Sequence, residues 1–281
     1  MKYLKMLRIK QYIKNLFVFV PLFFSASFND LHNINTTVFV FLEFCFISSC
    51  IYIINDIVDL ENDRKHPKKK NRPIASGEIS VKTAKIIAIV LMVFALFFAY
   101  ISKKYYSLIV ISIYFILNLA YSFVLKRIVL VDVFTISLGF LARVYAGAFA
   151  IDVKVSNWLL LTTLALSLFL AFGKRYGEKK NSDDNSSRYV LANYNLESLK
   201  LYLVITMTLT IVFYSLYCAM GSGVLGDQGI VTVPIVMFAM FRYFMILEKE
   251  DGDPTNLIFN DKVVGLCIIL YIVVAIILVW K

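Results

Sequence analysis

Nine runs of mostly apolar residues constrain this chain most, because each has roughly the 20 residues that a helix needs to cross a bilayer. Hydrophobic residues make up 60% of the 281 positions, whereas soluble domains hold about 45–50%. No polar stretch is long enough for a soluble domain. We therefore predict an all-α, polytopic membrane bundle of about nine transmembrane helices, forming a single domain over residues 1–281. The predicted spans are 15–31, 36–56, 83–102, 105–125, 129–151, 156–174, 200–221, 229–247 and 262–280.

Charge patterning predicts how the spans are oriented. The chain carries 29 Lys and Arg against 19 Asp and Glu. Most of the basic residues fall in the N-terminal segment and in loops that share one side of the membrane. Because cytoplasmic loops collect Lys and Arg, we expect the N-terminus and the long loops 57–82 and 175–199 to be cytoplasmic. Basic residues at membrane boundaries also argue against nucleic-acid binding.

An acidic cluster ends the second predicted span. Asn55, Asp59 and Asp63 are spaced i, i+4, i+8, so a continuous helix would present them on one face, with Asp56 nearby. Mg²⁺ prefers such hard oxygen ligands and commonly bridges carboxylates to substrate phosphates. The alternative is a solvated helix end, but acids at a helix C-terminus oppose the helix dipole. We therefore predict that these four residues bind Mg²⁺.

A basic segment, 64–77, follows the acids directly. Lys68 and Lys69 fit membrane topology or contact with anionic lipid. Arg72 lies between Asn71 and Pro73, and this rigid turn suggests a guanidinium aimed at a target. Acids that hold a metal, followed by bases that hold phosphate oxygens, predict a diphosphate site.

Three intramembrane acids and bases need separate interpretations. Asp132 and Arg143 in the fifth predicted span should face a protein interior, since charged groups are costly in lipid. For Arg143 we expect a substrate phosphate, or an acid of another helix, as partner. Glu43 lies within the second span, and we interpret it as a structural hydrogen-bonding residue.

The pattern N-D-x-x-D-x-x-x-D over 55–63, with the Arg72-Pro73 turn, resembles the first signature of the UbiA superfamily of intramembrane prenyltransferases. The resemblance implies nine helices with functional loops after helices two and six. Arg8-x-x-Gln11-Tyr12-x-Lys14-Asn15 is similar to the polyprenyl-phosphate phosphoribosyltransferase branch. That branch implies Mg²⁺-dependent transfer of 5-phosphoribose from phosphoribosyl diphosphate to a polyprenyl phosphate, in the plasma (inner) membrane of a bacterium.

One departure from the wider family is informative. Ordinary members carry a second acidic motif, D-x-x-x-D, at the end of helix six, whereas this chain has Lys174, Arg175 and Glu178 there. A cationic site at that place would suit an additional phosphate. The catalytic residues that we expect are Asp59, Asp63, Lys14 and Tyr121. The residues that we expect to contact substrate are Lys14, Arg72, Tyr121, Lys126, Arg143, Lys174 and Arg175.

Two other functions use some of the same features. An ordinary UbiA prenyltransferase would move a prenyl group from its diphosphate to an aromatic or other small acceptor. Lys174-Arg175 argues against it, because two acids are expected at that position. An ion-coupled transporter would show inverted repeats and broken helices, and the two halves of the chain have only weak similarity.

Overall fold

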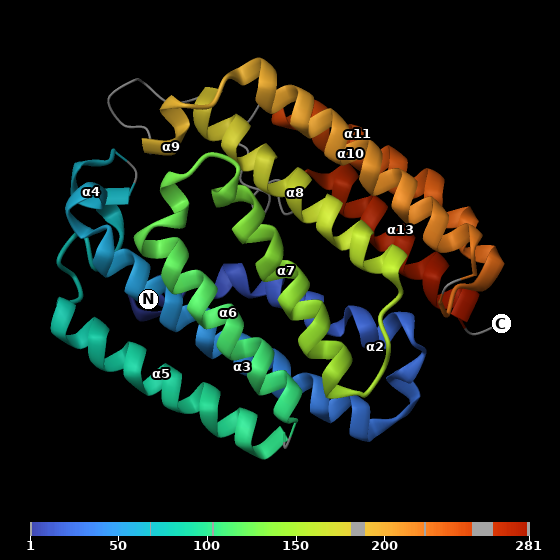
Figure 1. Ribbon diagram of the computed structural model, residues 1–281, viewed down its shortest axis with the longest axis horizontal. Coiled ribbons are helices and arrows are strands. Elements are labelled where there is room, and N and C mark those ends of the chain that lie inside the picture. Colours follow the sequence, from blue (N-terminus) through green and yellow to red (C-terminus); the bar gives the residue numbers. More distant parts are fainter. Residues whose placement is uncertain are drawn as a thin grey trace. The chain divides into compact units, whose positions relative to one another are not determined.

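The computed structural model describes residues 2–67, 69–102, 104–180, 189–221, 223–248 and 261–279. Throughout these ranges the regular structure is helical and contains no strand (Figure 1). Eight helical segments are long and apolar enough to cross a membrane. The predicted all-α membrane fold is therefore confirmed. The eight segments are α3 (Leu31–Val58), α5 (Val81–Ser102), α6 (Tyr105–Phe123), α7 (Val131–Ala150), α8 (Asn157–Lys180), α10 (Leu196–Ala219), η5 with α11 (Gly226–Leu247) and α13 (Lys262–Val279).

The chain divides into two compact units, which are described separately. The first unit comprises Met1–Leu22, Phe28–Thr135 and Ala142–Val153. The second comprises Phe23–Ser27, Ile136–Leu141 and Lys154–Lys281.

Helix α3 is the centre of the first unit. It packs along α5 and contacts α6 and the N-terminal segment (Figure 1). Its fully buried Val40 and Phe44 join Ile111 and Tyr114 of α6 in one apolar core. The Phe46 ring stacks on rings of α5. Because lipid tails are as apolar as these side chains, close packing rather than the hydrophobic effect holds α3 against its neighbours.

The prediction of a continuous helical span at 15–31 was wrong. The chain there forms η1 (Ile9–Phe19), a 3-10 helix, followed by the short α2 (Val20–Phe24) and η2 (Ser27–Asn29). Two polar side chains of η1 point to α3, where Tyr12 pairs with Ser49 at 2.8 Å and Asn15 donates to Ser48 at 3.3 Å. Apolar composition alone did not reveal that this segment is tied to a neighbouring helix through polar contacts.

A close backbone approach holds η1 in place within the first unit. Gly147 of α7 faces Val18, and a Cβ atom added to Gly147 would lie 2.0 Å from the Val18 carbonyl oxygen. Only glycine permits this approach, because any side chain would collide with backbone.

The acidic cluster lies where α3 ends and α4 (Leu60–Lys65) begins. Asp59 has φ −91° and ψ 8°, outside the helical region, so the single helix assumed for Asn55, Asp59 and Asp63 is interrupted at its middle member. The backbone hydrogen bonds from Asp59 to Asn55 and from Asp63 to Asp59 are nevertheless kept. The three residues therefore stay in successive turns of the backbone.

The second unit is built on two helix pairs. Helix α10 packs on α8, with the rings of Phe172 and Tyr202 5.1 Å apart, and α11 packs on α13. Arg242 of α11 binds Asp261, just before α13, at 2.8 Å. This hydrogen bond holds the pKa of Asp261 below its ordinary value. Helix α13 is the least buried of the spans, as expected for a lipid-facing helix.

Candidate active site

Asp56 and Asp63 share one arginine at the end of α3. Both carboxylates are almost fully buried, and one nitrogen of Arg72 reaches both, at 3.0 Å to Asp56 and 2.5 Å to Asp63. The turn that follows Arg72 is held by a backbone hydrogen bond from Ser76 to the Arg72 carbonyl at 2.8 Å. Charge-assisted hydrogen bonds of this kind are about twice as strong as neutral ones. The aimed guanidinium expected of Arg72 thus has two specific targets.

Arg8 is a member of this group that sequence reasoning did not select as a site residue. It forms an ion pair with Asp56 and lies over the Tyr52 ring, 4.9 Å from the ring centre. Its backbone has φ 53°, in the left-handed region, which is strained for a residue other than glycine. The signal was present in the Arg8-x-x-Gln11 pattern, but nothing local linked Arg8 to an acid 48 positions away.

Asp59 has a different partner. Lys126, in the short η4 turn (Leu125–Arg127) after α6, binds Asp59 at 2.5 Å, and both side chains are mostly buried. This contact gives Lys126 a specific carboxylate partner. Three carboxylates (Asp56, Asp59, Asp63) and three cationic side chains (Arg8, Arg72, Lys126) thus form one charge-balanced group, which we call the acid–base cluster.

The predicted Mg²⁺ ligands fit that ion by their chemistry. All four offer hard oxygen donors, and the buried amide oxygen of Asn55 accepts no hydrogen bond within the described part of the chain. The carboxylates, however, are bound by side-chain cations. Among the described residues, no three acidic, histidine or cysteine side chains gather into a metal site. Metal binding would therefore replace cationic side chains that now neutralise these acids.

The other first-unit residues that we expected to contact substrate differ in how deeply their side chains are buried. Lys14 of η1 and Tyr121 of α6 are half-buried. Arg143 is 4% exposed, and Asp132 is fully buried, so the prediction that both face a protein interior is confirmed. The Arg143 guanidinium donates to Asn15 at 2.8 Å and to the Tyr114 hydroxyl at 2.9 Å. These contacts join η1, α6 and α7, so Arg143 has a structural role, and phosphate contact by Arg143 stays a prediction.

Lys174 and Arg175 belong to α8 in the second unit. Arg175 is 1% exposed and binds Glu178, one turn later, at 2.7 Å. Lys174 is half-buried. Of the two, Lys174 is therefore the more accessible to an anionic ligand.

The family of the chain follows from a match over most of its length. The family model of the UbiA prenyltransferases matches residues 16–266. That range holds the acid–base cluster, apart from Arg8, and also Lys174 and Arg175 of α8. The chain belongs to the UbiA prenyltransferase family. UbiA members are transferases, so this protein is a multi-pass membrane transferase, and the transporter alternative is excluded.

Individual relatives indicate which branch of the UbiA family the chain resembles. The chain is 34% identical to a decaprenyl-phosphate phosphoribosyltransferase of Corynebacterium glutamicum, covering 92% of this chain and 81% of the relative. It is 31% identical to the protein of that name from Mycolicibacterium smegmatis, covering 96% and 89%. A UbiA homologue of Archaeoglobus fulgidus, solved with GPP and Mg²⁺, has a TM-score of 0.75 at 20% identity over the whole of both chains. That structure shows the fold alone. The resemblance to the polyprenyl-phosphate phosphoribosyltransferase branch of the UbiA superfamily is confirmed.

Proposed function

We propose that this protein transfers 5-phosphoribose from phosphoribosyl diphosphate to a polyprenyl phosphate. The observation that carries the proposal is the similarity, over nearly the whole chain, to proteins named decaprenyl-phosphate phosphoribosyltransferase. The basic residues Lys174 and Arg175 support it further. Both proposed substrates are phosphate esters, so a site for them needs more cationic side chains than a site for one prenyl diphosphate.

The acid–base cluster suits the leaving diphosphate. Asn55, Asp56, Asp59 and Asp63 would hold Mg²⁺, which, when bound, would neutralise the leaving group as a Lewis acid. Arg8, Arg72 and Lys126 now bind the acids. They would be released to bind phosphate oxygens once the acids bind the metal.

The remaining residues would position the two substrates. Lys14 and Tyr121 would contact the reacting groups, and Lys174 and Arg175 would hold the additional phosphate. The bond from the ribose C1 to the diphosphate breaks, and a phosphate oxygen of the lipid forms the new bond to C1. That oxygen is already ionised at neutral pH, so positioning and electrostatic stabilisation are sufficient without a general base. We place this site at the cytoplasmic face of the inner membrane, as the loop charges suggest.

The direct test is a membrane assay with labelled phosphoribosyl diphosphate and polyprenyl phosphate. We expect label in the lipid phase, loss of transfer when a chelator removes divalent metal, and recovery when Mg²⁺ is added back. Absence of labelled lipid, combined with transfer from a polyprenyl diphosphate to an aromatic acceptor, would replace this proposal by the ordinary prenyltransferase function.

A matched pair of variants tests the metal ligands. Asp59→Asn should lower transfer by at least about 100-fold, the usual cost of removing one electrostatic contact from a transition state. Asp30→Asn is the control, because Asp30 caps the opposite end of α3 through the backbone of His32. Equal activity of the two variants would remove Asp59 from the site.

A further inference from the structure

Glu43 is a buried acid that the proposed reaction does not use. It is the thirteenth of the 28 residues of α3, near the middle of a membrane-spanning helix, and none of its side chain is exposed. Neither carboxylate oxygen has a hydrogen-bond partner among the described residues. The interpretation of Glu43 as a structural hydrogen-bonding residue therefore stays a prediction. An acid so placed usually marks a site, because a charged group is costly there.

One hydroxyl group acts on this carboxyl. Ser102, at the end of α5, interacts with Glu43. Its hydroxyl also lies 2.9 Å from the Ala99 carbonyl, to which it can donate. While Ser102 donates to Ala99, its lone pairs can accept the proton of a neutral Glu43 carboxylic acid.

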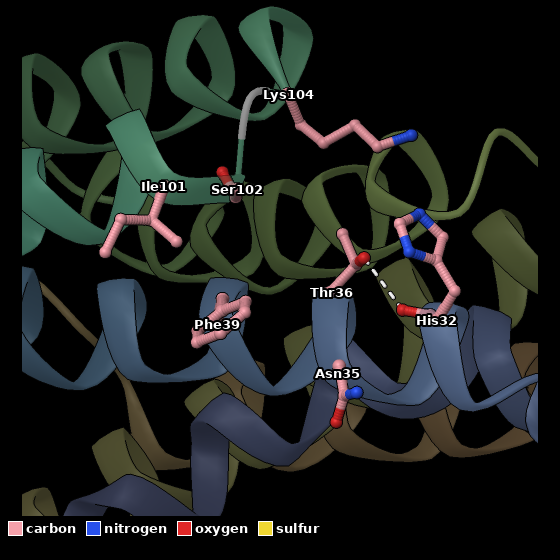
Figure 2. A pocket seen from close by; sticks show the side chains of 7 residues that line it. All are labelled: His32, Asn35, Thr36, Phe39, Ile101, Ser102 and Lys104. Atoms are coloured by element: carbon pink, nitrogen blue, oxygen red, sulfur yellow. Dashed lines mark hydrogen bonds between the residues drawn. The ribbon is translucent and has the colours of Figure 1, made fainter.

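A pocket lies between the start of α3 and the end of α5. Figure 2 shows His32, Thr36 and Phe39 along one side of the pocket, with Ser102 and Lys104 across from them. The cavity has a volume of about 550 Å³. His32, Thr36, Phe39 and Glu43 are spaced i, i+4, i+7, i+11, so they form one stripe on α3. Glu43 thus lies one turn below the pocket lining, and Ser102 belongs to both.

Two ionisable side chains line the pocket, and neither pairs with Glu43. Lys104 binds Asp152 at 2.6 Å, and His32 is exposed at the mouth. Glu43 itself forms no ion pair within the described part of the chain, and neither of its carboxylate oxygens is hydrogen-bonded there. No cationic side chain in the described part of the chain therefore compensates for the burial of this carboxyl group.

We propose that Glu43 is a proton-binding site: a carboxylic acid that is neutral in the resting protein and exchanges its proton through the pocket at the start of α3. The pocket lies at the start of α3, whereas the acid–base cluster lies at its end. The proton-binding site depends on neither the identity of the transferred group nor the proposed reaction. The competing occupant is a small monovalent cation held by an ionised Glu43.

Lipid-soluble carbodiimides test the protonation state, because they react with neutral carboxylic acids in apolar surroundings. The acid proton moves to a carbodiimide nitrogen and the carboxyl oxygen bonds to the central carbon, giving an adduct that carries the whole reagent. We expect mass spectrometry to find this adduct on Glu43 at neutral pH, with a yield that falls as pH rises. The adduct should be absent from Glu43→Gln. No adduct at any pH where the protein stays folded, or protection by Na⁺ at constant pH, would overturn the proposal.

A second variant tests the route. Asn35 is exposed and lines the pocket, so Asn35→Trp should slow modification of Glu43 by a water-soluble carbodiimide several-fold, without affecting the lipid-soluble reagent. Leu31→Trp is the control, because Leu31 is 74% exposed and is not part of the pocket lining. Equal rates in the wild type and Asn35→Trp would exclude the pocket as the route. Both measurements read modification rather than turnover, so they are independent of the proposed function.

Discussion

At the scale of single residues, the acid–base cluster combines contacts that sequence could predict with one that it could not. Asp56, Asp63 and Arg72 lie within 17 positions of one another, and their spacing indicated a common site. Arg8 pairs with Asp56 across 48 positions. Such a contact depends on where η1 packs, and no local pattern encodes that placement.

Asp56 and Asp63 share Arg72, so removing this side chain should strongly lower both stability and transfer. Arg72→Gln leaves two buried carboxylates without that cation, which typically destabilises a protein by about 3–5 kcal/mol. Arg8 still contacts Asp56, so we expect a loss at the lower end of that range, together with loss of transfer. Thermal unfolding in detergent and the transfer assay measure the two effects.

Arg64→Gln is the matched control, since its ion pair with Glu61 is half or more exposed on both sides. We expect it to change stability by less than about 1 kcal/mol, as is usual for surface pairs. If the two substitutions destabilise the protein equally, Arg72 does not neutralise the buried acids.

At the scale of elements, apolar runs predicted the eight confirmed spans because each is a continuous α-helix, or a 3-10 turn continued by one. The same signal failed at 15–31. Runs of apolar residues report burial in lipid or protein, but not the helix type, and η1 is fixed by its contacts with α3 and α7. The interruption of the helix at Asp59 could not be predicted from sequence either, because the i, i+4, i+8 spacing is the same in a continuous helix and in an interrupted one.

The approach of η1 to α7 predicts a difference between two glycines. Gly147→Ala would drive a methyl group into the Val18 carbonyl, and overpacking of this kind costs about 1–3 kcal/mol. Gly265→Ala in α13 meets nothing within 4 Å and should stabilise the helix by roughly 0.5–1 kcal/mol. Unfolding temperatures that shift in the same direction for both variants would contradict this packing.

At the scale of the whole molecule, the family and the membrane fold could be predicted from sequence because a short, specific motif accompanied the apolar runs. The division into two units could not, because it depends on which helices contact which. The separate location of Lys174 and Arg175 in the second unit follows from that division. Their partnership with the first-unit residues stays a prediction.

The proposed orientation can be tested with single cysteines. All four native cysteines are buried and free, so their background reaction with a membrane-impermeant maleimide should be low. Lys104→Cys should react from outside intact cells, and Arg127→Cys only after the membrane is opened. The reverse result would place the acid–base cluster on the outer face.

The order of the acid–base cluster along the chain bears on its biosynthesis. Arg8, Asp56, Asp63 and Arg72 all lie within the first 72 positions, whereas Lys126, the partner of Asp59, comes at the end of α6. As the ribosome delivers the chain, α3 can therefore enter the membrane with Asp56 and Asp63 already matched by arginines. Asp59 receives its lysine two helices later, so this pair is the last part of the cluster to be assembled.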